Sequence, residues 1–208
     1  APLMLRVGLT GGIASGKSTV ASLLRDMDCP VLDADPLGHE LLEQGQAAYD
    51  EVVQEFGKGV LDSYGNVDRS KLGKIVFADA QKRARLNQIL HPRILDVIRK
   101  WFAALDQLGG PELAIVEAAL IIEAGYHKEL DKLIVCWCRP EQQIERLKER
   151  GLTDEQAQMR ISAQMPMEEK RQLADEPIDC TGSIEETERQ VAEAVKRLMQ
   201  AATSGKKA

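Results

Sequence analysis

The segment with the clearest chemical meaning covers residues 11–19, which read Gly11-Gly12-Ile13-Ala14-Ser15-Gly16-Lys17-Ser18-Thr19. It fits the pattern G-x-x-x-x-G-K-[ST], in which two glycines, a lysine and a hydroxyl residue have fixed spacing. Glycines let the backbone turn tightly enough for successive N–H groups to surround an anion, and the following helix adds its positive dipole end. The segment therefore predicts a phosphate-binding loop and a nucleoside triphosphate ligand.

The residues on either side of this loop favour the same interpretation. The apolar run at 5–10 is typical of a strand, and residues 18–24 continue as a helix with an apolar face. In such a loop we expect Lys17 to reach the outer phosphates and the Ser18 hydroxyl to bind the accompanying Mg²⁺. An ordinary glycine-rich turn between strand and helix is the alternative, and this context disfavours it.

The composition of the chain limits its size class and its partners. Its 208 residues suffice for one α/β domain with a small insertion, and 44% hydrophobic with 29% charged residues is typical of a soluble globular protein. A net charge of −6 and only 4% aromatic residues argue against a nucleic-acid partner and against adhesion to a membrane. Four cysteines without zinc or redox spacing, and no apolar run of membrane-spanning length, indicate a cytoplasmic protein.

Strand patterns occur at both ends of the chain, with helical patterns between them. We expect strands at 5–10, 30–33, 113–117 and 133–138 and an edge strand at 177–179; the nearly continuous apolar runs predict a parallel sheet buried on both faces. From 36 to 108 we expect helices at 37–43, 47–56, 70–77, 81–90 and 92–108 and a loop at 57–68. This predicts an all-helical insertion that builds a substrate site. Charged helices follow at 142–150, 154–164 and 168–173, then an amphipathic helix at 184–199 and a frayed tail from 201 to 208.

Two carboxylates, Asp33 and Asp35, follow the second expected strand. The carboxyl ends of parallel strands line the ligand crevice, so this pair should lie near the triphosphate, one carboxylate toward Mg²⁺ and one toward an acceptor hydroxyl. The alternative is a helix cap and a turn, with Pro36 as the first helical residue. Asp35-Pro36-Leu37-Gly38 also fits the D-x-x-G of GTPases, but the chain has no N-K-x-D segment to read guanine.

Cations for a polyphosphate are available after the fourth expected strand, at Arg139, Arg146, Arg150 and Arg160. Arg146 and Arg150 are four residues apart and share one helix face, so they are candidates to neutralise a transferring phosphoryl group. Ion pairing with the neighbouring glutamates is the alternative. The three histidines form no metal constellation, and His91-Pro92 is expected to open a helix, where His91 either caps and packs or contacts a ligand.

Several of these segments, in this order, resemble one family. The run 7–18 is similar to the opening of dephospho-CoA kinases, and Asp33-Ala34-Asp35 to their D-A-D signature. Further matches are Leu90-His91-Pro92-Arg93-Ile94 to L-H-P-x-I, Leu120-Ile121-Ile122-Glu123 to L-L-x-E, and Arg146, Arg150, Gln164 and Ala174-Asp175 to positions of the family's C-terminal half. The resemblance covers about residues 5 to 200, and the ordered set is more specific than the loop alone.

The resemblance implies a three-layer P-loop, nucleoside-kinase-like α/β core with a parallel sheet. In a single domain at 5–201, the core comprises 5–36 and 111–201, the helical lid about 139–175, and the helical CoA-binding insertion about 37–110; 202–208 is a tail. It implies ATP- and Mg²⁺-dependent phosphorylation of the ribose 3′-hydroxyl of dephospho-CoA, the last step of coenzyme A synthesis, by a monomer. The implied residues are Asp35, Lys17 and Arg146 for catalysis, 11–19 and Arg150 for ATP, Thr10, Asp35 and His91 for the substrate, and Ser18 and Asp33 for the metal.

This chain departs from the family pattern at three places. Ala14 replaces the third loop glycine, and its methyl group is tolerated there if the residue has a negative φ. Ala119 replaces a proline before L-L-x-E, and Cys180-Thr181 replaces asparagines at the adenine end. Two other functions fit the loop: another small-molecule or nucleoside monophosphate kinase, which competition by CoA-like molecules would separate, and a nucleotide-dependent switch, which would bind without turnover.

Overall fold

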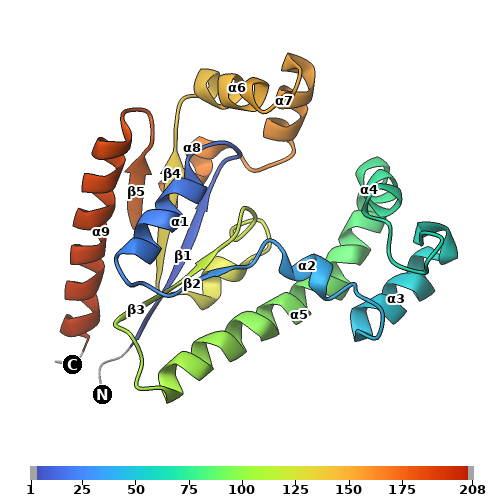
Figure 1. Cartoon of the computed structure of the whole chain (residues 1–208), viewed down its shortest axis with the longest axis horizontal. Coiled ribbons are helices and arrows are strands. Elements are labelled where there is room, and N and C mark those ends of the chain that lie inside the picture. Colours follow the sequence, from blue (N-terminus) through green and yellow to red (C-terminus); the bar gives the residue numbers. More distant parts are fainter. Residues whose placement is uncertain (1–3, 206–208) are drawn as a thin grey trace. The chain divides into compact units, whose positions relative to one another are not determined.

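A five-stranded parallel sheet, in the order β2–β3–β1–β4–β5, forms the centre of the computed structural model, which describes residues 4–205 (Figure 1). The strands are β1 (Leu5–Gly11), β2 (Val31–Asp33), β3 (Leu113–Glu117), β4 (Lys132–Trp137) and β5 (Glu176–Asp179). The predicted parallel α/β sheet is confirmed, with β5 at an edge. In this register Leu9 lies beside Glu117 of β3, and Gly11 lies beside Cys136 of β4. The carboxyl end of the central strand therefore leads directly into the phosphate-binding loop.

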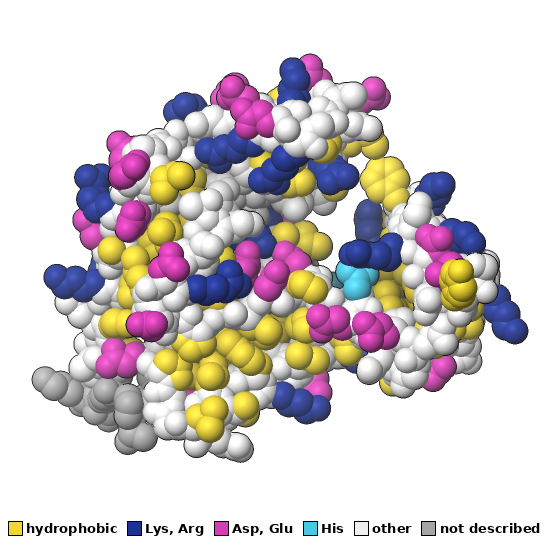
Figure 2. Space-filling view, viewed as in Figure 1, with side chains coloured by type: hydrophobic (Ala, Val, Ile, Leu, Met, Phe, Trp, Pro, Cys, Tyr) yellow, Lys and Arg dark blue, Asp and Glu magenta, His cyan; other side chains and the backbone are white. Residues whose placement is uncertain are grey.

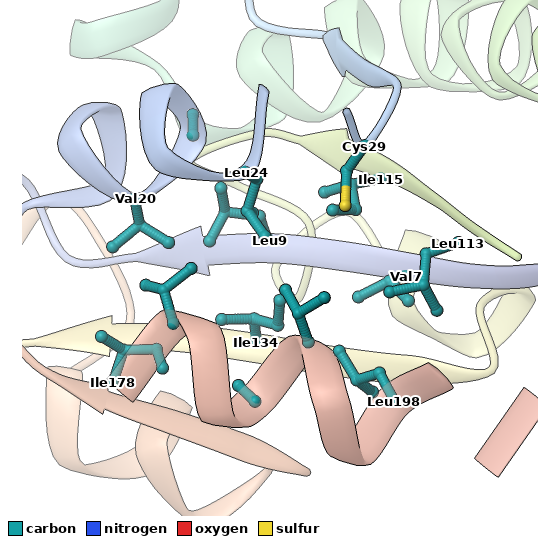
Figure 3. Close-up of a cluster of buried hydrophobic side chains, with 14 of the residues drawn as sticks. Val7, Leu9, Val20, Leu24, Cys29, Leu113, Ile115, Ile134, Ile178 and Leu198 are labelled. Carbon is teal, nitrogen blue, oxygen red and sulfur yellow. The ribbon is translucent and has the colours of Figure 1, made fainter. Parts of the chain in front are cut away.

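Helices α1 (Lys17–Asp26) and α9 (Ile184–Ser204) supply the apolar side chains that pack with the sheet. In the view of Figure 3, Val7 and Leu9 of β1 lie between Val20 and Leu24 of α1 and Leu198 of α9, and all five side chains belong to one buried cluster. All five side chains are almost completely buried, and each such burial contributes about 1.5–3 kcal/mol. This packing fixes the position of β1 and therefore of the loop that follows it.

Three short helices follow β4: α6 (Pro140–Glu149), α7 (Asp154–Ser162) and α8 (Met167–Gln172). Leu147 of α6 and Ala157 of α7 form a small apolar cluster with Ala14 of the loop. The family resemblance places α8 within the lid, at about 139–175, and in the structure α8 packs against β4 and β1. The phosphate-binding loop is therefore contacted by helices that come much later in the chain.

Residues 34–101 form a second compact unit. It contains α2 (Leu37–Glu40), α3 (Ala47–Phe56), the 3₁₀ turn η1 (Lys58–Val60), α4 (Arg69–Ala78) and most of α5 (Ala80–Gln107). The unit has its own apolar core, which includes Leu42, Val52, Val60, Leu72 and Ile89. Asp68 caps α4 by accepting hydrogen bonds from the backbone N–H groups of Ser70 and Lys71. Except for η1, the regular elements of this segment are helical, as the sequence predicted.

The expected break before Pro92 is wrong, because α5 runs without interruption from Ala80 to Gln107. A proline inside a helix removes one N–H donor and crowds the preceding turn. Here the Arg93 guanidinium donates to the carbonyl of Ile89 at 2.7 Å and pairs with Glu51 of α3 at 2.6 Å. The bond to Ile89 lies within α5, and the pair with Glu51 joins α5 to α3. Together they hold the turn around Pro92, so His91 lies inside a helix and does not open one.

Helix α9 also differs from expectation, since it continues to Ser204 and buries Leu198 and Ala202. The predicted frayed tail is therefore wrong for 201–204, and its last three residues lie outside the described part of the chain. On the face shown in Figure 2, Lys and Arg side chains are interspersed with Asp and Glu. Within residues 4–205, the helices are too short or too polar to span a bilayer.

The connection between β3 and β4 contains one short regular element. The 3₁₀ turn η2 (Tyr126–Glu129) precedes β4 and buries Tyr126, and burial raises the pKa of this phenol to about 12. The four cysteines are buried and free. Burial is the main cause that raises the thiol pKa of Cys29 and of Cys138.

Candidate active site

The loop between β1 and α1 has the backbone geometry that its sequence pattern predicts. Gly16 precedes α1 with φ of 102°, a conformation that favours glycine, and Lys17 is the first residue of the helix. A Cβ atom at Gly11 would lie 2.5 Å from the Ser15 hydroxyl oxygen and 2.6 Å from the carbonyl of Cys136. Gly16 is therefore required by its backbone conformation, and Gly11 by the lack of space for a side chain.

Ser15 supplies a test of whether this loop suits a ligand. Its hydroxyl oxygen is buried and has no hydrogen-bond partner among residues 4–205. A buried polar group without a partner costs about 1–3 kcal/mol, which a bound phosphate oxygen would offset. The loop therefore fits an anionic ligand on the basis of its side chains as well as its backbone.

Ala14 was expected to have a negative φ, but its φ is 57°, in the left-handed region. For a residue with a Cβ this conformation costs about 1–2 kcal/mol. Two donors contact its carbonyl: the Arg146 guanidinium at 3.0 Å and the Cys138 thiol at 3.8 Å. These contacts hold the strained residue in place.

Side chains of the predicted lid surround the middle of the loop. The Gln143 amide donates to the carbonyl of Ile13 at 2.8 Å, and the N–H of Ile13 donates to the Gln164 side-chain oxygen at 2.9 Å. Arg146 also donates to the carbonyl of Cys180, at 2.8 Å. The structure thus brings Arg146 to the loop, where its guanidinium binds two carbonyl oxygens.

A cavity of about 240 Å³ adjoins the loop on the side of Arg146. Its lining consists of loop residues, both candidate arginines and the turn after β5, namely Ala14, Gly16, Thr19, Arg146, Arg150, Cys180, Gly182, Ile184 and Thr187. Arg146 and Arg150 therefore line the same cavity, in agreement with the shared helix face that their spacing predicted. The Cys180 thiol has a lowered pKa, caused mainly by a hydrogen bond with Cys136, whose own pKa is raised by the same bond.

Glu117, the last residue of β3, is a site residue that the sequence analysis missed. Its side chain is 7% exposed, and its carboxylate lies 3.5 Å from the Lys17 ammonium and 3.6 Å from the Arg25 guanidinium. Burial raises the pKa of Glu117, while Lys17 acts in the opposite direction. The available signal was an acidic residue that ends an otherwise apolar strand.

Asp33 ends β2 and lies beside Glu117 in the sheet register. The two carboxylates therefore share the sheet edge from which Lys17 and Ser18 begin α1. Oxygen donors of this kind suit Mg²⁺, which usually takes one or two carboxylates together with phosphate oxygens and water. Within residues 4–205, no group of three or more acidic, histidine or cysteine side chains forms a separate metal cluster.

The remaining predicted site residues have different outcomes. Thr10 is completely buried, and its hydroxyl donates to the carbonyl of Ala119 at 3.1 Å; its substrate contact stays a prediction. Asp35 is exposed and belongs to the second unit, two residues beyond the end of β2. His91 also belongs to that unit, and burial lowers its pKa. The roles of Asp35 and His91 stay predictions.

Comparison with known proteins adds a family match. Residues 5–186 match the family model described as dephospho-CoA kinase. The chain is 45% identical over 195 residues to a dephospho-CoA kinase of Aquifex aeolicus, covering 94% of this chain and 98% of that protein. It is 43% identical over 186 residues to one of Carboxydothermus hydrogenoformans, covering 89% and 90%.

Solved structures give the same picture. A Thermus thermophilus protein superposes with a TM-score of 0.81 at 33% identity, covering 94% of this chain and 98% of that one. A dephospho-CoA kinase from Campylobacter jejuni superposes with a TM-score of 0.71 at 26% identity, covering 96% and 99%. A shikimate kinase from Bacteroides thetaiotaomicron, at 15% identity and a TM-score of 0.53, shares the fold.

Proposed function

The chain belongs to the dephospho-CoA kinase family, and on this premise we propose that it transfers the γ-phosphoryl group of ATP to the ribose 3′-hydroxyl of dephospho-CoA, giving coenzyme A and ADP. The observation that carries the proposal within the structure is the loop at 11–16, which ends β1 and starts α1 at Lys17, next to Glu117. This loop supplies the phosphate site, and the family supplies the acceptor.

The roles of the loop residues follow from their chemistry. Backbone N–H groups of the loop, the Lys17 ammonium and the start of α1 bind the phosphates. The carboxylate of Glu117 pairs with the Lys17 ammonium at 3.5 Å and holds it in position. Ser18 and Asp33 are the candidate ligands for Mg²⁺, which, when bound, would neutralise charge on the phosphate oxygens. Arg150, in the cavity beside the loop, is the candidate for the nucleotide, and Arg146 keeps Ala14 in position while adding positive charge.

Asp35 is the proposed base. It follows the end of β2 by two residues, so its Cα stays within about 7 Å of the Cα of Asp33 whatever the arrangement of the two units. An exposed carboxylate at this point of the chain orients the 3′-hydroxyl and accepts its proton late, because the transition state of phosphoryl transfer is loose. Positioning and charge then contribute more than the strength of the base. We propose that the enzyme works as a cytoplasmic monomer.

The decisive experiment incubates the protein with ATP, Mg²⁺ and dephospho-CoA and looks for coenzyme A by mass. Parallel reactions offer a nucleoside monophosphate or shikimate as the acceptor. Formation of coenzyme A with at least a hundredfold preference over the other acceptors is expected. Preferential phosphorylation of another acceptor, or ATP binding without transfer to any of them, would refute the proposed function.

A further inference from the structure

Lys170, in α8, is the most deeply buried charged side chain in the described part of the chain, with 0% of its surface exposed. Its ammonium donates to the carbonyl of Ala119 at 2.9 Å and to that of Gly11 at 3.4 Å. It also pairs with the carboxylate of Glu123 at 3.1 Å. Burying a charged group costs several kcal/mol unless it is paired and hydrogen-bonded, and these contacts meet that requirement.

Stability alone does not require a cation at this position. A buried ion pair can often be replaced by apolar residues of similar volume without loss of stability. The surroundings of Lys170 are the start of the phosphate-binding loop and the turn that follows Glu117. The ammonium therefore connects the two segments that carry the phosphate site, which suggests that it contributes to function.

The contact with Gly11 bears directly on the loop. The peptide between Gly11 and Gly12 has a glycine on each side, so it can rotate with little steric resistance. Because this peptide is trans, its N–H points away from its carbonyl. Holding the Gly11 carbonyl on the Lys170 side therefore directs the Gly12 N–H to the opposite side, where it is available as a donor.

Neighbouring contacts support the same arrangement. Met167, one turn before Lys170 in α8, accepts a hydrogen bond at its sulfur from the N–H of Cys138 and lies against Gly12, where a Cβ atom would clash with it. The Thr10 hydroxyl donates to the same Ala119 carbonyl as Lys170. The segments around Gly11 and Ala119 are thus held together from β1 and from α8.

From this geometry we infer that Lys170 is a positioning residue for phosphate binding: its ammonium fixes the Gly11–Gly12 peptide and couples the loop to the turn after Glu117. It does not touch the nucleotide. Its removal lets the peptide rotate and can turn a carbonyl oxygen toward the phosphates, which repels them. The inference deepens the proposed function. The expected effect of removing Lys170 on turnover rests on that function, whereas the expected effect on ATP affinity does not.

The test uses the double variant Lys170→Met, Glu123→Gln, which removes both charges and leaves no unpaired buried ion. We expect its Kd for Mg·ATP to rise at least tenfold and kcat to fall at least tenfold, with the KM for dephospho-CoA changed less than twofold. The thermal midpoint should stay within a few degrees of the native value. ATP affinity and kcat within twofold of the native enzyme would overturn the inference.

Two further variants separate positioning from the ion pair. Glu123→Gln alone keeps the ammonium on both carbonyls, so ATP affinity should change less than twofold; a loss equal to that of the double variant would contradict the inference. Lys148→Met, which breaks a surface ion pair with Asp154 at 3.1 Å, is the matched control and should match the native enzyme. If the double variant fails to fold, Lys170→Gln replaces it, with a loss of ATP affinity of at least threefold expected and native affinity contradicting the inference.

The two proposals can fail separately. If the native protein binds Mg·ATP but does not convert dephospho-CoA, the proposed function is wrong, and the affinity of the Lys170 variants for Mg·ATP still decides the inference. If the native protein makes coenzyme A and the double variant binds ATP normally, the inference alone is wrong.

Discussion

The carboxylate of Glu117 lies 3.5 Å from the Lys17 ammonium, so the last residue of β3 meets the first residue of α1. The two side chains are 7% and 15% exposed. An ammonium held in this way is aimed before the nucleotide arrives, which reduces the entropy that its ordering would otherwise cost. The buried carboxylate therefore has a positioning role toward the residue that contacts the phosphates.

Replacing Glu117 by Gln should lower kcat by about tenfold to a hundredfold, because a misplacement of Lys17 by about 1 Å is enough for such a loss. The fold should survive, since a neutral amide avoids the desolvation that raises the pKa of this carboxyl. Steady-state kinetics with both substrates measure the effect. Glu112→Gln, an exposed glutamate just before β3, is the control and should be native-like. Unchanged kcat in Glu117→Gln would contradict the positioning role.

Asp35→Asn should reduce kcat by about 10² or more if the carboxylate accepts the proton of the 3′-hydroxyl, while ATP affinity stays near native. The amide keeps the size of the side chain but cannot serve as the base. Asp50→Asn, on α3 in the same unit, is the matched control with native turnover expected. The assignment of Asp35 is wrong if its variant turns over at a near-native rate with an intact fold.

The strands and the phosphate-binding loop were predictable because their signals are local. Apolar runs specify buried strands, and the glycines at 11 and 16 belong to a spaced pattern that is recognisable in the sequence itself, although Gly11 is also crowded by the carbonyl of Cys136 in β4. The parallel sheet was predictable from the nearly continuous apolar runs, which are typical of strands buried on both faces. These features need few long-range contacts to be recognised.

The features that were missed depend on residues far apart in the sequence. Helix α5 continues through Pro92, where Arg93 pairs with Glu51 of α3, 42 residues earlier in the chain. The roles of Glu117 and Lys170 appear only when β3 and α8 lie beside the loop. Ala14 takes a positive φ that its sequence does not favour, held by Arg146 from 132 residues away.

Tyr126 gives an expected pH dependence of stability. Its pKa is raised to about 12 by burial, against about 10 in an unfolded chain. Between these values the unfolded chain releases a proton that the folded protein keeps, so the free energy of unfolding falls as pH rises from about 10 to 12. Below pH 10 the phenol is neutral in both states and contributes no pH dependence.

The variant Tyr126→Phe isolates this effect, because phenylalanine does not titrate. Urea unfolding at pH 9 and at pH 11.5 should show the native protein losing up to about 2 kcal/mol more than the variant over this interval. A difference between the two proteins that stays constant with pH would show that the phenol ionises equally well in the folded state.

Replacing Ala14 by Gly should change the free energy of unfolding by less than about 1 kcal/mol. Relief of the left-handed strain, about 1–2 kcal/mol, is offset by the larger entropy of glycine in the unfolded chain and by loss of the buried methyl group that packs with Leu147 and Ala157, about 0.8 kcal/mol. Urea unfolding checks this value. Ala21→Gly, within α1, is the comparison and should destabilise by about 1 kcal/mol or more, because Ala21 is buried in a regular helix. A loss of stability in Ala14→Gly as large as that in Ala21→Gly would contradict the strain argument.

The two arginines of the nucleotide cavity should give different phenotypes, although they are only four residues apart. Arg146 binds the carbonyls of Ala14 and Cys180, so Arg146→Met should lower the free energy of unfolding by about 2 kcal/mol and also weaken ATP binding. Arg150 caps the end of α6 and lines the cavity with an exposed side chain. Arg150→Met should therefore raise the KM for ATP severalfold with a change in stability below about 0.5 kcal/mol. Unfolding in urea without nucleotide, combined with kinetics at varied ATP, separates the two effects. Equal losses of stability in both variants would mean that the carbonyl contacts of Arg146 do not hold the loop.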